Sequence, residues 1–204
     1  ADIYESENLG TNAVHYNANM VLLEHERADQ RQDRCSRFLE EECAKYREVI
    51  YVMGNHEHYG YQFHKTYDHI KSQLPTNVHL LEKESYEIDG VIFMGGTLWT
   101  DMNNHDQLTL YHMKSMMNDY RQVTMLNETN GAYHKLQPEK TVTEHIKTKQ
   151  YFTQQLSENR MSGRNKPVVV CTHHSPSKAS THPRYADDII MNGAYRSEER
   201  RVGK

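Results

Sequence analysis

Two short apolar runs stand out in a largely polar chain, and polar side chains follow each run at once. Residues 49–53 (Val-Ile-Tyr-Val-Met) lead into Gly54-Asn55-His56-Glu57, and residues 167–171 (Pro-Val-Val-Val-Cys) lead into Thr172-His173-His174-Ser175-Pro176. A continuous apolar run of this length is typical of a strand buried on both faces in a parallel sheet. The pattern therefore predicts two buried strands, each with histidines at its carboxyl end.

The spacing of apolar residues after the first motif predicts a helix. Tyr59, Phe63, Tyr67, Ile70 and Leu74 recur at intervals of three and four residues, which is one face of a helix. The glycine that opens the motif lets the chain turn sharply between the strand and this helix. The motif is thus expected at the carboxyl end of a strand, the edge at which open α/β sheets bind ligands.

Three further segments are predicted to be helical. Apolar spacing indicates a helix from Thr11 to His25 and another over residues 38–46, and a capping box at residues 141–144 predicts a helix that runs to about Arg160. Between them lies a polar stretch in which a stripe of side chains at helical spacing is better explained by packing than by binding: Met113, Met116, Met117 and Tyr120.

A second sheet, packed on the first, is predicted from the middle of the chain. Residues 78–81, 86–88 and 91–94 are expected strands, and Asp89-Gly90 is a strong hairpin signal between the last two. Residues 179–192 are expected to form a loop. The predicted fold class is therefore α/β, with two packed sheets flanked by helices.

Asn55, His56 and Glu57 either form part of a metal site or simply satisfy backbone groups in a turn. An amide oxygen suits a hard or borderline divalent cation, a histidine can bind metal or transfer protons near neutral pH, and Glu57 could orient a histidine. Gly-Asn pairs are also common in ordinary turns. The second strand end with histidines favours the metal site, because two strands of one sheet that end at the same edge can direct their side chains at one ion.

Length and composition limit the possible classes. A chain of 204 residues predicts one domain, over residues 1–204. A net charge of −4 provides no broad cationic field, which argues against nucleic-acid binding. The count of 3 cysteines argues against a disulfide framework and favours a reducing cytoplasm. Since no apolar run approaches ~18 residues, no membrane association is expected.

The motifs resemble those of the calcineurin-like metallophosphoesterases. Gly54-Asn55-His56-Glu57 matches that family's Gly-Asn-His-(Glu/Asp) signature, and Thr172-His173-His174-Ser175-Pro176 is similar to its later strand-end histidine motif. Ala1-Asp2 resembles its Gly-Asp motif, and residues 95–101 resemble a strand end of its phage and bacterial branches. The resemblance implies an α/β/β/α sandwich of two mixed sheets flanked by helices.

The same resemblance implies a hydrolase for phosphoesters that uses two divalent cations (Mn, Zn or Fe). Asp2 would bridge the cations, Asn55 and His173 would bind one of them, and His56 would lie near the phosphate. Glu57 would contact the metal ligands rather than the cations. His174 is the alternative to His173, because the sequence does not show which of the two side chains faces the site. Substrates would be phosphorylated small molecules, nucleotides or proteins.

Two parts of the family pattern are missing. An Asp-x-His motif normally precedes the Gly-Asp motif, and a Gly-His-x-His motif normally follows, but the last histidine here is His182. We therefore expect an incomplete core of a longer enzyme, with a disordered tail at about residues 197–204. The alternative is a catalytically incomplete remnant that binds a ligand or partner without turnover.

Overall fold

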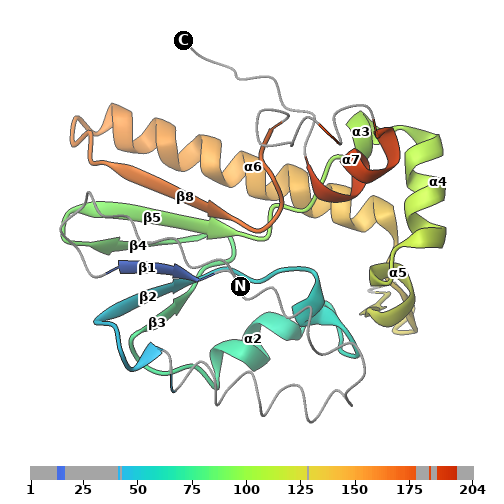
Figure 1. The fold of residues 1–204 in the computed structure, drawn as a ribbon, viewed down its shortest axis with the longest axis horizontal. Coiled ribbons are helices and arrows are strands. Elements are labelled where there is room, and N and C mark those ends of the chain that lie inside the picture. Colours follow the sequence, from blue (N-terminus) through green and yellow to red (C-terminus); the bar gives the residue numbers. More distant parts are fainter. Residues whose placement is uncertain are drawn as a thin grey trace.

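Strand β2 (Glu48–Tyr51) lies at the centre of the fold because both of its faces are apolar. The computed structural model describes residues 13–16, 41, 43–127, 129–177, 184 and 188–196. In it, β2 pairs in parallel with β1 (Ala13–Tyr16) on one side and with β3 (Val78–Leu80) on the other. These three strands form the first sheet, whose central strand is the apolar run before the Gly-Asn-His-Glu motif (Figure 1).

The second sheet contains β4 (Glu84–Ile88), β5 (Val91–Gly96) and β8 (Val168–Thr172), in the order β4-β5-β8. Strands β4 and β5 form the predicted hairpin, and the backbone at Asp89 (φ 50°) and Gly90 (φ 81°) has the two positive φ angles of a tight two-residue turn. Strand β8 pairs in parallel with β5, which brings the second histidine motif to the end of this sheet.

The side chains of β2 alternate between two cores. Val49, Tyr51 and Met53 pack on the outer side of the first sheet, where α2 (Thr66–Lys71) contributes Tyr67 and Ile70. The intervening side chains pack between the sheets. Ile50 and Val52 belong to one cluster with Leu81, which follows β3, and with Ile88, Phe93 and Cys171 of the second sheet. Burial on both faces explains why this strand is continuously apolar.

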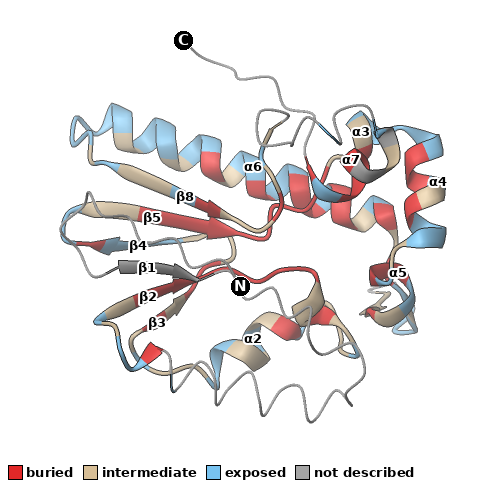
Figure 2. Cartoon of the chain, in the orientation of Figure 1, coloured by how far each residue is buried: buried red, intermediate tan, exposed pale blue. Residues whose placement is uncertain are grey.

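Helix α6 (Pro138–Met161) covers the outer face of the second sheet, where Phe152 packs on Met94. The layers are therefore helix, sheet, sheet and helix (Figure 1), and Figure 2 shows buried residues on the strands with α6 exposed on its outer side. This arrangement confirms the predicted α/β class. None of the described helices has the length and apolar character needed to cross a membrane.

A lobe between β5 and α6 packs beside the ends of the sheets. It contains α3 (Met102–His105), α4 (Gln107–Met116), α5 (Asp119–Gln122), β6 (Thr124–Leu126) and β7 (Tyr133–Lys135), and α7 (Ile189–Tyr195) packs on it. Most of the methionine stripe is packed here, as predicted, with Met113 and Tyr120 buried. Met116 is 56% exposed and does not belong to that core.

Several predicted elements are wrong. Residues 13–16, predicted as part of a helix, form β1, because pairing along β2 outweighs the local apolar spacing; the rest of residues 11–25 lies outside the described residues. The helix predicted after Glu57 is interrupted at Gly60, whose φ of 74° turns the chain, so only a short 3-10 helix η2 (His56–His58) and α2 form.

Three further corrections concern pairing and helix ends. Residues 78–80 belong to the first sheet, not the second, since they pair with β2. Helix α6 begins at Pro138, whose missing N–H costs nothing in a first turn, so the predicted capping box lies inside the helix. Part of the loop predicted at residues 179–192 is helix α7.

Candidate metal site

The two histidine-bearing strands belong to different sheets, contrary to the prediction of one shared sheet. Strand β2 lies in the first sheet and β8 in the second. Because the sheets pack face to face, the chain that leaves the end of each strand still reaches the same region. The side chains of Asn55 and His173 meet there, 118 positions apart in sequence.

The contact between Asn55 and His173 is a direct hydrogen bond. His173 Nε2 lies 3.0 Å from Asn55 Oδ1. An amide oxygen only accepts, so the imidazole nitrogen is the donor. Asn55 is 9% exposed, and the neighbouring Gly54 provides the room for the ring, since a Cβ on Gly54 would lie 2.7 Å from His173 Cε1. Glycine is therefore required here by the approach of the imidazole.

His173 is held in its neutral form. Burial, together with the nearby His56, lowers the pKa of His173 to about 4. A neutral imidazole offers a nitrogen lone pair, which is the form that binds metal. The ring is therefore available as a ligand at neutral pH once the Nε2 proton has moved.

His174 points away from Asn55 and into the protein. Its Nδ1 donates to the carbonyl oxygen of Thr97 at 3.1 Å, and its ring stacks on Trp99 with centroids 5.5 Å apart. Burial, with the adjacent His173, lowers the pKa of His174 to about 3. Of the two histidines that the sequence left open, His173 is the one that lies beside Asn55.

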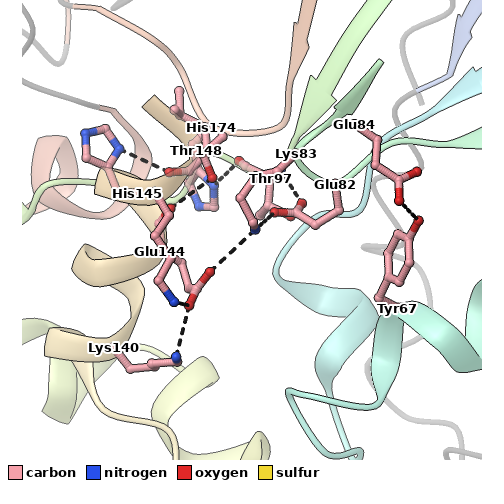
Figure 3. Close-up of polar contacts among 12 residues, drawn as sticks. Tyr67, Glu82, Lys83, Glu84, Thr97, Lys140, Glu144, His145, Thr148 and His174 are labelled. Carbon is pink, nitrogen blue, oxygen red and sulfur yellow. Dashed lines mark hydrogen bonds and ion pairs between the residues drawn. The ribbon is translucent and has the colours of Figure 1, made fainter. Parts of the chain in front are cut away.

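A buried ionic network behind Thr97 supports this strand end (Figure 3). Glu82 Oε2 accepts hydrogen bonds from the Thr97 backbone nitrogen at 2.8 Å and from its hydroxyl at 2.9 Å. Lys83 pairs with Glu82 at 2.5 Å and with Glu144 of α6 at 3.4 Å. Burial would raise the pKa of the Glu144 carboxyl, but Lys140 and the other nearby lysines hold it below its usual value. The network fixes the carbonyl that receives His174.

Glu57 turns back toward its own strand. Its carboxylate accepts hydrogen bonds from the Gly54 backbone nitrogen at 2.9 Å and from the Tyr51 hydroxyl at 3.0 Å. Burial raises the pKa of Glu57 to about 7. Its contacts fix the turn that carries Asn55. Among the described residues Glu57 makes no hydrogen bond to a histidine, so it does not orient one as the sequence suggested.

His56 lies at the start of η2, partly exposed, with its ring 4.5 Å from that of Tyr59 between centroids. It follows Asn55 directly in the chain, and it lowers the pKa of both His173 and Asp119. His56 therefore borders the Asn55–His173 pair without being part of it.

Asp119 is the residue at this site that sequence reasoning missed. Its Oδ1 accepts a hydrogen bond from Asn55 Nδ2 at 2.7 Å, and its Oδ2 accepts one from the Tyr59 hydroxyl at 3.4 Å. Its side chain is 1% exposed, and burial raises its pKa, with Asn55 acting against that shift. In sequence it is one of many polar residues between 101 and 131, and no motif sets it apart.

The Asn55–His173 pair brings an amide oxygen and an imidazole nitrogen together at 3.0 Å, the ordinary length of a hydrogen bond. Both atoms are of types that bind divalent cations. Among the described residues, however, no group of three or more His, Cys, Asp or Glu side chains is arranged to hold a metal. Asp2, the expected bridging ligand, lies outside the described residues.

Comparisons with known proteins identify a relative of this chain, but they indicate no activity for it. No family model matches the chain, and no solved structure matches it. The uncharacterized protein L509 of Acanthamoeba polyphaga mimivirus is 27% identical over 154 residues, which cover 72% of this chain and 49% of that protein. The chain thus spans about half the length of the curated relative it matches.

Proposed function

We propose that this chain is the core of a metal-dependent phosphoester hydrolase of the calcineurin-like metallophosphoesterase type, with that family's α/β/β/α sandwich. The observation that carries the proposal is the 3.0 Å contact between Asn55 Oδ1 and His173 Nε2, which joins the two motifs that resemble the family. The order of layers, helix, sheet, sheet and helix, also supports it.

In this proposal Asn55 and His173 would hold one of two divalent cations (Mn, Zn or Fe), and Asp2 would be a further ligand of the pair. When bound, the cations would supply charge that attracts the phosphoryl oxygens and activates water. The chain's own contribution is to orient the ligands. Gly54 admits the His173 ring, and Glu57 fixes the turn that carries Asn55.

His56 is the proposed catalytic residue. It follows Asn55 in the chain and is partly exposed, so a bound phosphoester could reach its ring. An imidazole there can donate a proton to the leaving oxygen or stabilise the negative charge that develops on it. The proposed substrates are phosphorylated small molecules, nucleotides or proteins.

Manganese-dependent cleavage of p-nitrophenyl phosphate and its bis ester tests the proposal. His56→Ala should lower kcat roughly 100-fold or more, as expected for a general acid, with Mn²⁺ still bound. Asn55→Ala and His173→Ala should instead weaken Mn²⁺ binding itself. The exposed His105→Ala provides a control histidine that should change neither quantity. Turnover by the wild-type chain in excess chelator would contradict the proposal.

A second candidate is a remnant that binds a ligand or partner without turnover. The absence, among the described residues, of a group of three His, Cys, Asp or Glu side chains arranged around a metal favours it. Titration with Mn²⁺ separates the two candidates. Two bound ions with turnover support the hydrolase, whereas one weakly bound ion without turnover supports the remnant.

A further inference from the structure

An asparagine side chain can serve as a metal ligand in only one of its two orientations. Its oxygen has lone pairs for a cation, whereas its NH₂ group offers only donors and would repel one. A half turn about the last side-chain bond exchanges the two ends without changing the volume of the side chain. Something must therefore hold the Asn55 oxygen toward His173.

Asp119 is the group that distinguishes the two ends of the Asn55 amide. Its carboxylate accepts hydrogen bonds, so the nitrogen end of Asn55 must face it, and Nδ2 lies 2.7 Å from Asp119 Oδ1. The oxygen end is then directed at His173 Nε2, 3.0 Å away. Turning the amide round would place an oxygen against a carboxylate and a donor against a donor.

Asp119 is itself held from two sides. The Tyr59 hydroxyl donates to its second oxygen at 3.4 Å, and the next residue, Tyr120, is joined through its hydroxyl to Thr141 Oγ1 of α6 at 3.1 Å. The Asp119 side chain is almost fully buried, so these contacts are protected from water. Helix α5 is in this way fixed to both η2 and α6.

We propose that Asp119 is a positioning residue, which keeps the amide oxygen of Asn55 turned toward the cation site without binding the cation. This inference rests on the proposed function, because it takes Asn55 to be a metal ligand. It assigns a task to the lobe between β5 and α6, which sequence motifs leave without one.

Two substitutions remove the discrimination to different degrees. Asp119→Asn keeps an oxygen that can accept from Asn55 Nδ2 but can also turn its own NH₂ group toward Asn55, whereas Asp119→Leu keeps the branched shape and removes the acceptor. Asp119→Ala also removes the acceptor and replaces the leucine variant if that variant does not fold. Tyr120→Phe is the matched control, because it loosens α5 at Thr141 and leaves the Asp119 carboxylate in place.

The first measurement needs no metal. Hydrogen exchange of the Asn55 side-chain NH₂ group, followed by NMR, should be at least tenfold faster in Asp119→Leu than in wild type, since a hydrogen bond to a charged group is lost. In Tyr120→Phe it should stay within about threefold of wild type, and in Asp119→Asn it should lie between wild type and Asp119→Leu. Wild-type exchange in Asp119→Leu would overturn the inference.

The second measurement is the affinity for Mn²⁺. Asp119→Leu should weaken binding roughly 10–100-fold, the usual effect of removing a group that orients a ligand. Asp119→Asn should lie between Asp119→Leu and wild type, and Tyr120→Phe should bind nearly as wild type does. Wild-type affinity in Asp119→Leu, or an equal loss in Tyr120→Phe, would overturn the inference. A wild-type chain that binds no Mn²⁺ contradicts the proposed function, and the exchange result then still decides whether Asp119 fixes the amide.

Discussion

Each residue at the candidate site owes its role to its contacts, and the sequence shows only some of these contacts. The sequence singled out Gly54 as a turn residue, and the structure adds that its missing Cβ makes room for the His173 ring. It also singled out Asn55 and His173 as partners, which lie in hydrogen-bond contact. Asp119 could not be found in this way, because a buried polar contact between residues 64 positions apart leaves no local pattern.

Gly54→Ala should therefore act through His173. The added methyl group would lie 2.7 Å from His173 Cε1 and 2.9 Å from Nδ1, so the ring must move. We expect a loss of roughly 1–3 kcal/mol in the free energy of unfolding and weaker Mn²⁺ binding, measured by urea denaturation and by titration. Gly90→Ala is the control, since a Cβ there meets open space and only the positive φ of 81° opposes it. Equal Mn²⁺ affinity in the two variants would show that the ring does not depend on Gly54.

At the scale of elements, the sequence predicted which segments form strands better than it predicted which strands pair with each other. The strands β2, β5 and β8 and the hairpin turn at Asp89-Gly90 were correct, since each depends on local chemistry. The expected burial of β8 was wrong, because β8 is the last strand in the order β4-β5-β8 and its Val170 is 44% exposed. The assignment of β3 to the second sheet was wrong, because strand partners are chosen by packing that local spacing does not encode. The same limit applies to β1, whose helix-like spacing is outweighed by pairing with β2.

Thr97→Val tests how firmly the ionic network holds the end of β5. Valine keeps the shape of threonine but removes the hydroxyl that donates to Glu82 at 2.9 Å, while the backbone hydrogen bond at 2.8 Å remains. Because Glu82 is mostly buried, we expect the free energy of unfolding to fall by about 1–3 kcal/mol. Thr143→Val, an exposed threonine on α6 whose hydroxyl binds only its own helix, should change it by less than about 0.5 kcal/mol. Similar effects in both would mean that the network does not stabilise this strand end.

At the scale of the whole molecule, buried neutral imidazoles should make the fold sensitive to acid. Burial lowers the pKa of His58 to about 3, of His173 to about 4 and of His174 to about 3. Below the ordinary histidine pKa of about 6.5 the unfolded chain binds protons that the folded chain resists, so stability falls as the pH decreases. Glu57 acts in the opposite direction. Its pKa in the folded chain is raised to about 7, so the folded chain takes up this proton before the unfolded chain does. This contribution to stability grows as the pH falls from about 7 toward the ordinary pKa of glutamate.

His58→Phe isolates one of these groups. His58 is 3% exposed, stacks on Phe63 with centroids 4.6 Å apart, and among the described residues its Nδ1 has no hydrogen-bond partner. Between pH 6.5 and 5 the wild type should lose about 1.6 kcal/mol through this histidine alone, because the slope rises from about 0.7 to about 1.4 kcal/mol per pH unit over this range. Denaturant unfolding at the two pH values should show that loss reduced by this amount in the variant. An unchanged loss would mean that His58 takes up its proton in the folded state.

Asn55 and His173, brought together from two packed sheets, are proposed to bind one cation between them. The most direct test is a crystal of this chain soaked in Mn²⁺, with an anomalous difference map calculated at the manganese edge. We expect a peak about 2.1–2.2 Å from both Asn55 Oδ1 and His173 Nε2, as for metal ligands in other proteins. A map with no peak there, and with the direct hydrogen bond between the two side chains still intact, would contradict the account.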